Sequence, residues 1–289
     1  MSPDNLLAKV KELREITGVG FKDCKNAIDE TKGDIQKSIE LLRKKGIAKA
    51  SKRMGRTAAE GLICISEKNG KIAMIEINSE TDFVAKNNEF IQFAEEISNL
   101  SINSSGKIED ILNLKMKNKK SVNENLIDLV SKIGEKITLR RCVCIENSKN
   151  INFSYTHSAL KKNIGKLGVL LSVETTKQKK DIVDLGKQLA MQVASLSPLA
   201  VDKDGLDSNI LEKEKEIITE ELKTSGKDNK IIEKIALGKL NKFIAENTLL
   251  NQDWIMEPKK KVRDVINQVA GKDKIKVKKF VRFKVGEGL

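Results

Sequence analysis

The sequence predicts an α+β protein with an N-terminal three-helix module, a core of two similar α+β subdomains with antiparallel sheets, and an inserted helical hairpin. Three observations predict this class. Apolar residues recur at helical spacing in the first 46 residues, strand-like and helix-like segments occur in two stretches that match at one offset, and residues 207–247 carry two narrow helical stripes. A chain of 289 residues is long enough for about two domains.

The predicted order of segments follows from these patterns. They are a three-helix module (1–46), a basic linker (47–60), the first core subdomain (61–147), the first part of the second subdomain (148–200), an antiparallel helical hairpin (201–250), and the completion of the second subdomain (251–289).

Three short helices make up the predicted N-terminal module. The first ends at the turn Thr17–Gly20, the second follows it, and the third begins after Gly33 with Asp34 as its N-cap. We expect Gly46 to end the third helix, because glycine is the common C-terminal stop. The helical apolar positions are Leu6, Val10, Leu13, Phe21, Cys24, Ala27, Ile28, Ile35, Ile39 and Leu42.

A β-hairpin is predicted next, with strands at 62–66 and 71–78 joined through Asn69-Gly70, a strong turn signal. Ala73, Ile75 and Ile77 alternate toward one face. A loop over 79–87 leads to a helix with Phe90, Phe93, Ala94 and Ile97 on its apolar face. Residues 101–122 are polar and carry no clear pattern, and a helix at 123–133 and a strand at 136–145 complete the unit.

The second stretch repeats this pattern at an offset of 96 residues. A strand at 153–157 precedes a strand with Val169, Leu171 and Val173 and a helix with Leu189, Ala190 and Val193. The offset pairs these six with Ala73, Ile75, Ile77, Phe93, Ala94 and Ile97, but only Ala94 and Ala190 are identical. Internal duplication is thus a hypothesis beside coincidence of apolar classes. The loop at 79–87 breaks the offset and has no expected counterpart.

Charged residues surround both stripes of the predicted hairpin, which suits two helices that stand away from the body. Residues 224–228 form the expected turn. The stripes are Leu211, Ile218 and Leu222, and Ile232, Ala236, Leu240 and Phe243. After Pro258 we expect a short helix with Val262, Val265 and Ile266, and then a strand in which Ile275, Val277, Val281 and Phe283 alternate with Lys274, Lys276, Lys278, Arg282 and Lys284.

Several classes of protein are excluded. No apolar run approaches the ~18 residues of a membrane span, and the first residues lack the features of a targeting segment, so we expect a cytoplasmic protein. The four cysteines lack Cys-x-x-Cys spacing and are expected to be buried free thiols. His157 is the only histidine, and no phosphate-binding glycine motif occurs. We therefore expect no catalytic centre, no bound metal and no cofactor.

The net charge of +13 suggests nucleic acid as a partner, but two observations weaken this interpretation. Only 8 of the 54 basic residues are arginine, and ten aromatic residues offer little base stacking. The excess charge lies in residues 43–56, with seven basic and no acidic residues, and in 257–289, with eleven basic and four acidic. A ribosome- or RNA-associated binding protein remains the alternative function.

The loop Glu80–Asn87 contains the most distinctive short motif, in which Asp82 precedes Phe83. The pattern alone favours burial, with Asp82 capping a turn and Phe83 packing onto the following helix, since large aromatic side chains are usually inside. The alternative is an exposed aromatic beside an acid, which is typical of an interface hot spot.

Seven motifs in order resemble those of the bacterial elongation factor Ts family, and together they span nearly the whole chain. They are Val10–Gly20, Asp23-Cys24-Lys25 with Gly33-Asp34-Ile35, Glu80–Lys86, Lys132–Glu135, Arg140-Arg141, Met256-Glu257-Pro258 and Phe280–Gly288. The resemblance implies a guanine-nucleotide exchange factor, not an enzyme, whose partner is elongation factor Tu. It also implies that the first module is similar to ubiquitin-associated domains and that the hairpin is a coiled coil.

The resemblance further implies which residues touch elongation factor Tu. Thr81, Asp82, Phe83 and Val84 would enter its G domain and disturb the Mg²⁺ site. Arg14 and the turn formed by Thr17, Gly18, Val19 and Gly20 would contact another face of that domain. Tyr155 and His157 match a further contact motif, although for His157 a polar strand-end position is an equally good interpretation. No membrane, small-molecule substrate or nucleic acid is expected as a partner. Several family members continue into a C-terminal helix, and since this sequence ends at Leu289, we expect that contact to be absent or replaced.

Overall fold

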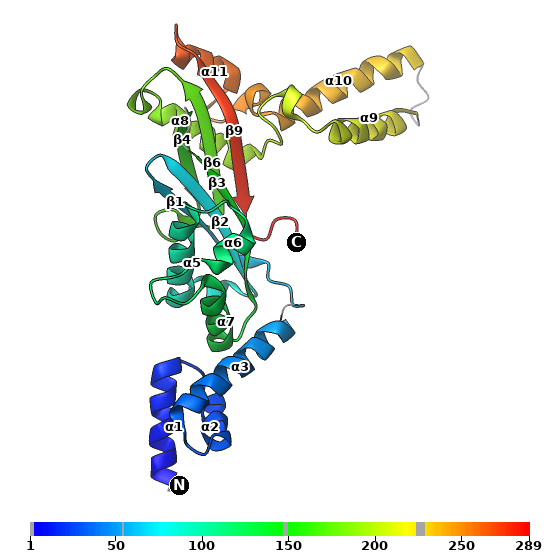
Figure 1. Ribbon diagram of the computed structural model, residues 1–289. Coiled ribbons are helices and arrows are strands. Elements are labelled where there is room, and N and C mark those ends of the chain that lie inside the picture. The colour runs from blue at the N-terminus through cyan, green and yellow to red at the C-terminus, as the bar shows by residue number, and fades with distance from the viewer. Residues whose placement is uncertain (1–2, 54, 147–149, 224–228) are drawn as a thin grey trace.

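A computed structural model of the chain describes residues 3–53, 55–146, 150–223 and 229–289, and it has the predicted α+β architecture (Figure 1). Two antiparallel sheets lie face to face at the centre. Helices cover the outer face of each sheet, the three-helix module lies at one end, and a helical hairpin projects from the other. Among the described helices, none is long and apolar enough to cross a membrane.

The N-terminal module has the three predicted helices, α1 (Pro3–Thr17), α2 (Phe21–Glu30) and α3 (Ile35–Arg53), around a small apolar core. Asp34 caps α3 as predicted, because its Oδ1 accepts a hydrogen bond of 3.0 Å from the Lys37 amide. Phe21, one of the predicted apolar positions of the module, lies outside its core and is 43% exposed.

The prediction that Gly46 ends the third helix is wrong, and residues 47–53 of the predicted linker are helical. Gly46 is buried against the Ser131 side chain, and Arg53 Nη1 donates a hydrogen bond of 2.9 Å to the Val130 carbonyl. Tertiary contacts with the core therefore outweigh the ~1 kcal/mol that a glycine costs inside a helix.

The first sheet has the strand order β3-β2-β1-β5, and all its pairings are antiparallel. The β1–β2 hairpin turns at Asn69 and Gly70, whose φ values of 51° and 76° explain the Asn-Gly pair. Its strands are β1 (Glu60–Lys68), β2 (Lys71–Ser79), β3 (Ile137–Ile145) and β5 (Ile164–Gly165).

The second sheet has the order β4-β6-β9 and is again antiparallel. Its strands are β4 (Asn150–His157), β6 (Leu167–Thr175) and β9 (Ile275–Lys284), and a small separate ribbon pairs β7 (Asp253–Trp254) with β8 (Glu257–Lys261).

Helices cover the outer faces of both sheets. On the first sheet they are α4 (Asp82–Ala85), α5 (Asn88–Ser101), α6 (Ile108–Asn113) and α7 (Val122–Ile133), and on the second α8 (Val183–Leu196) and α11 (Val262–Ala270). Short 3₁₀ turns are η1 (Lys179–Asp181), η2 (Lys203–Gly205) and η3 (Leu249–Asn251). The 101–122 segment, which has no clear sequence pattern, contains α6 and buries Ile111 completely.

The inner faces of the two sheets form a third apolar layer, in which Ile63, Ile72 and Met74 meet Leu170 and Phe283. This layer explains why β1 and β2 are buried on both faces and not only on the alternating face that the sequence predicts. The sheets approach closely at Gly168, where an added Cβ would lie 2.6 Å from Ile63 Cγ2.

The central strand and the following helix of the two subdomains correspond. The central strands β2 and β6 begin 96 residues apart, and helices α5 and α8 have equal lengths and begin 95 residues apart. The connection between β6 and α8 contains the 3₁₀ turn η1 where the first subdomain has α4, but the motif of the 79–87 loop has no counterpart there, as expected, since residues 176–182 contain no aromatic side chain. The two connections thus differ in side chains more than in length.

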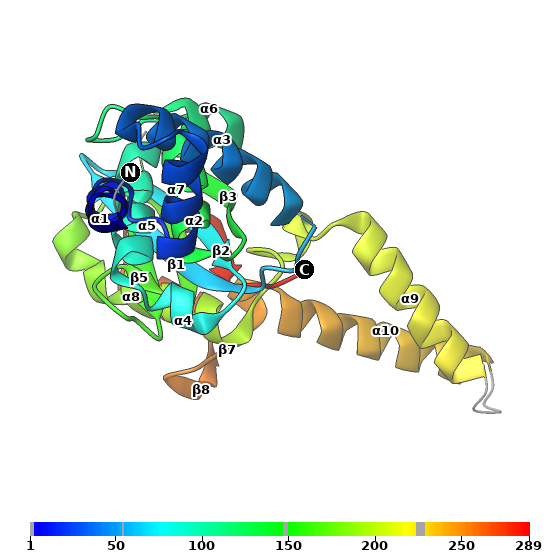
Figure 2. The same ribbon diagram turned by 90° about the horizontal axis from the view of Figure 1, so that it is seen from below.

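The hairpin comprises α9 (Ser208–Lys223) and α10 (Asn229–Asn247) and projects from the body in both ribbon views (Figures 1 and 2). Ile218 and Leu222 are buried between the helices, and Lys239 Nζ pairs with Glu221 across them at 2.7 Å. The predicted turn at 224–228 lies outside the described residues.

Among the cysteines, Cys24 and Cys64 are buried free thiols as predicted, whereas Cys142 and Cys144, on the edge strand β3, are only half-buried.

Glu76 joins the two subdomains from a fully buried position on β2. Its carboxylate accepts hydrogen bonds from Arg140 Nη1 at 3.0 Å, from Arg141 Nε at 2.5 Å, and from the Gly286 amide at 2.9 Å, just beyond β9. Burial acts to raise the pKa of the Glu76 carboxyl, but hydrogen bonds from Gly286, Asn78 and Arg141 outweigh burial and hold that pKa below its ordinary value.

We expect acid to weaken the fold partly through Glu76. Because the pKa of its carboxyl is lower in the folded chain, the stabilisation is complete above the unfolded-chain pKa of about 4.3 and is lost as the pH falls through the folded-state pKa. Thermal melts from about pH 7 to about pH 3 would measure this loss. The Glu76→Gln variant, which cannot titrate at this position, should lose less stability over that range, and an identical acid profile would contradict the prediction.

Candidate functional site

Phe83 is the most exposed aromatic side chain of the described residues, with 80% of its surface accessible. It belongs to α4, a one-turn helix at the end of β2 that appears at the surface of the body in Figure 2. The next two residues, Val84 and Ala85, take the buried positions of this turn. The burial that the sequence pattern favours for Phe83 is therefore wrong, because a single helical turn has only one inward face.

Asp82 lies beside Phe83 and pairs with Lys86 one helical turn later, with 2.7 Å between Oδ2 and Nζ. The hydrogen bond from Lys86 holds the pKa of the Asp82 carboxyl below its usual range. The same contact raises the pKa of the Lys86 ammonium. At neutral pH the exposed ring is thus flanked by an ionised carboxylate, while Thr81 and not Asp82 occupies the N-cap position of α4.

The segment before α4 is attached to the turn that follows α7. Thr81 donates hydrogen bonds to Glu135 from its amide and its hydroxyl, and Glu80 accepts one from the Lys136 amide. Two motifs that are separate in the sequence, Glu80–Lys86 and Lys132–Glu135, therefore meet in space.

The predicted contact residues of the N-terminal module are not equally accessible. Arg14 and Gly20 are exposed, Thr17 and Gly18 are half-buried, and Val19 is buried in the module core. The side chain of Val19 is therefore unavailable to a partner unless the module opens. Two apolar residues that were not predicted as contacts, Ile16 and Phe21, flank this turn and are 56% and 43% exposed. The exposure of Ile16 could be predicted from the sequence, since this residue lies off the apolar stripe formed by Leu6, Val10 and Leu13 in the first helix.

Tyr155 and His157 lie on β4, in the second sheet, and thus on an element separate from the other two groups. The Tyr155 hydroxyl and His157 Nδ1 are 3.0 Å apart. Tyr155 also lines a hollow of about 540 Å³ between β4 and α8, where Asp184 and Lys187 face it. The structure brings these two residues together, but it does not join them to the Thr81–Val84 segment.

No candidate metal site accompanies these surfaces in the part of the chain that the structure describes. Among residues 3–53, 55–146, 150–223 and 229–289, no three His, Cys, Asp or Glu side chains are grouped closely enough to hold a metal ion. The arrangement offers an exposed aromatic, a fixed carboxylate and two further exposed patches, which are features of a protein-binding surface.

Comparison with known proteins points to one family. Residues 80–287 match the family model described as Elongation factor TS. Elongation factor Ts of Methylorubrum populi is 40% identical over 285 residues, which cover 98% of this chain and 92% of that protein. The same factor from Bartonella quintana is 40% identical over 290 residues, covering 98% and 93%, and that of Maricaulis maris is 38% identical over 288 residues, covering 98% and 92%.

Proposed function

The chain belongs to the elongation factor Ts family, and we propose that it is a guanine-nucleotide exchange factor that binds elongation factor Tu with bound GDP and promotes GDP release in translation elongation. The observation that carries this proposal is the exposure of Phe83 on a turn whose preceding residues are tied to the core. An exposed phenylalanine costs solubility, and a partner surface that accepts it gives a reason for its position.

The proposed mechanism requires no catalytic residue on this chain. Mg²⁺ and the phosphate-binding loop hold the nucleotide in a G protein, so a side chain that displaces the elements around Mg²⁺ weakens nucleotide binding. Phe83 is the proposed wedge that enters the G domain of elongation factor Tu, and Thr81 and Val84 support it. The carboxylate of Asp82 would lie near the Mg²⁺ site of that domain. A protein that binds the empty G protein more tightly than the GDP form must lower GDP affinity by the same factor.

Two further surfaces are proposed to hold elongation factor Tu while Phe83 acts. Arg14, Thr17, Gly18 and Gly20 would contact it on one side, together with the exposed Ile16 and Phe21. Tyr155 and His157 would contact it from the second sheet. Binding at several separate patches gives a large interface from small individual contacts.

The alternative of an RNA-associated protein is less well supported. Among the described side chains of the basic segment 43–56, four have intramolecular partners: Arg43 pairs with Glu124, Lys45 with Glu30, Arg53 with the Val130 carbonyl, and Arg56 with Glu80. These contacts explain part of the basic charge without an external partner.

GDP release from elongation factor Tu tests the proposal directly. With labelled GDP on elongation factor Tu and an excess of unlabelled nucleotide, substoichiometric amounts of this protein should accelerate release, since one molecule can act on many. Release at the spontaneous rate would contradict the proposed function. Unchanged release together with RNA binding that weakens steeply with salt would favour the alternative.

A further inference from the structure

Glu135 holds the residue that directly precedes Asp82 and Phe83. One oxygen of its carboxylate accepts a hydrogen bond from the Thr81 amide at 3.0 Å, and the other accepts one from Thr81 Oγ1 at 2.7 Å. Hydrogen bonds to an ionised carboxylate are shorter and stronger than those between neutral groups. This pair therefore fixes both the backbone and the side chain of Thr81.

The tether replaces the local contact that would normally stabilise α4. Thr81 occupies the N-cap position, but its hydroxyl donates to Glu135 and accepts no hydrogen bond from the helix amides. A helix of four residues is unstable alone, because helix formation needs a costly first turn. The Asp82–Lys86 pair is exposed and adds little. The orientation of α4 is thus set mainly by tertiary contacts, namely the packing of its buried residues and the hydrogen bonds between Thr81 and Glu135.

A second tether acts one residue earlier. Glu80 accepts a hydrogen bond of 2.6 Å from the Lys136 amide and lies 3.3 Å from Arg56 Nη1. Residues 80 and 81 are therefore bound by residues 136 and 135, and the end of β2 cannot swing freely away from the turn after α7.

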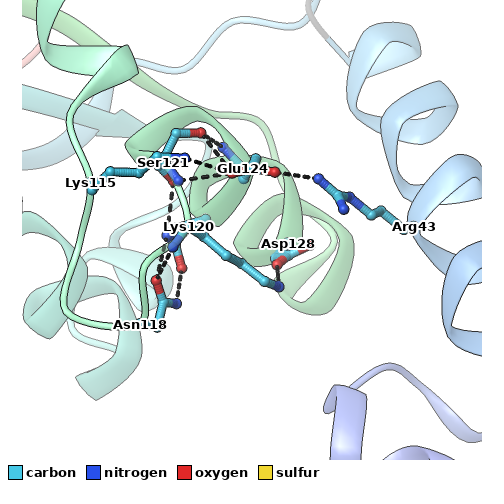
Figure 3. A network of polar contacts seen from close by, with 8 residues as sticks. Arg43, Lys115, Asn118, Lys120, Ser121, Glu124 and Asp128 are labelled. Carbon is cyan, nitrogen blue, oxygen red and sulfur yellow. Dashed lines mark hydrogen bonds and ion pairs between the residues drawn. The ribbon is translucent and has the colours of Figure 1, made fainter.

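The turn that carries Glu135 is itself well supported. Gly134 ends α7 in the left-handed conformation with φ of 90°, which reverses the chain toward Thr81. At its other end, α7 begins with a capping box between Ser121 and Glu124, and Glu124 also pairs with Arg43 of α3 (Figure 3). The same helix therefore carries both the N-terminal module and the support of the Phe83 segment.

We propose that Glu135 is the positioning residue for Phe83: by holding Thr81, it presents the exposed ring to the partner in one orientation. Glu135 itself touches neither the nucleotide nor the partner in this role. The gain is preorganisation, since a segment that is already ordered loses less conformational entropy on binding. This inference rests on the proposed exchange function, but the tether can be tested without it.

The first test uses the free protein. Backbone amide hydrogen exchange at Thr81 should become at least about tenfold faster in Glu135→Ala, because the amide loses a charged acceptor. Glu89→Ala is the matched control: Glu89 pairs with Lys132 of the same helix α7 and its change should leave the Thr81 amide protected. Unchanged protection of Thr81 in Glu135→Ala would overturn the proposal.

The second test is a double-mutant cycle on GDP release. Glu135→Ala should lower the rate at subsaturating concentration about tenfold in the wild-type background but less than about twofold in the Phe83→Ala background, because no ring is left to position. Effects that are equal in both backgrounds would overturn the proposal. If Glu135→Ala folds poorly, Thr81→Val against Thr81→Ser replaces it, since only serine keeps the hydroxyl that Glu135 binds.

The two tests separate the failure of this inference from the failure of the proposed function. Loss of Thr81 protection with normal GDP release by Glu135→Ala, while Phe83→Ala is slow, overturns the positioning role alone. If the wild-type protein does not stimulate release at all, the positioning role and the proposed function are overturned together.

Discussion

Replacement of Phe83 by alanine is expected to slow the stimulated release of GDP from elongation factor Tu about thirtyfold at subsaturating concentration. The ring is 80% exposed in the free protein, so a partner that buries it removes most of roughly 150–250 Å² from water. Truncation of such a hot spot costs about 2 kcal/mol or more, which corresponds to this factor. The measurement is the initial rate of labelled GDP release at several concentrations of the variant.

The stability of the free protein provides the control for this substitution. Since Phe83 contributes little to the core, its removal should change the free energy of unfolding by less than about 0.5 kcal/mol. Val269 is also an exposed apolar residue, but it lies on α11, far along the chain from Phe83. Its replacement by alanine should leave both stability and GDP release unchanged. A Phe83→Ala protein that melts normally and still releases GDP at the wild-type rate would rule out the wedge.

The elements that depend on local pattern could be predicted from the sequence. The β1–β2 hairpin is encoded by Asn69-Gly70, and helix α5 by an apolar stripe in which Phe90, Ala94 and Ile97 are completely buried. The correspondence between the two central strands also follows from their alternating apolar residues, because β2 and β6 begin 96 residues apart, the offset that pairs these residues in the sequence. For these segments the residues within one or two turns decide the structure.

The errors occur where distant residues decide. Gly46 does not end its helix because Ser131 and Val130 provide contacts that no local pattern contains. The exposure of Phe83 depends on Val84 and Ala85 filling the small space under α4. The site is therefore only partly predictable: the motif around Phe83 is visible in the sequence, but its attachment to Glu135, 54 residues away, is not.

Glu76 is the clearest residue whose role is invisible in the sequence. It stands between Ile75 and Ile77 in a strand, a position that alternation assigns to a solvent-facing side. In the structure that side faces the second sheet, and the carboxylate is completely buried. The motifs Arg140-Arg141 and Phe280–Gly288 supply its partners, so the family resemblance at these positions has a structural explanation.

Replacement of Glu76 by alanine is expected to destabilise the protein by about 3 kcal/mol, the low end of the range for breaking a buried ion pair. The low end applies because the Arg140 and Arg141 side chains remain 20% and 30% exposed and can recover some hydration. For a chain of this size the melting temperature should fall by roughly 6–12 °C. Thermal melts and denaturant titrations measure the change.

Glu287→Ala is the matched control for this prediction, since Glu287 directly follows Gly286 but its side chain is 45% exposed, and its partner Arg282, which is 13% exposed, also donates to the Ala194 carbonyl. Removal of the exposed Glu287 carboxylate should cost less than about 1 kcal/mol. Equal destabilisation by the two variants would show that charge near β9, and not the buried carboxylate, is what matters.

The consequence of losing Glu76 extends beyond the stability of one strand, because its partners come from both subdomains. Arg141 lies on β3 of the first sheet, while the Gly286 amide follows β9 of the second, and Arg141 Nη2 also donates to the Lys284 carbonyl at 3.2 Å. Without the carboxylate, the Gly286 amide loses its acceptor, and the guanidinium groups of Arg140 and Arg141 lose the negative charge that they share. Repulsion and desolvation then both act at the junction between the sheets. We therefore expect hydrogen-exchange protection in Glu76→Ala to fall first at the end of β9 and on β3, while α1, α2 and their turn keep theirs; uniform loss across the chain would contradict a role at the junction.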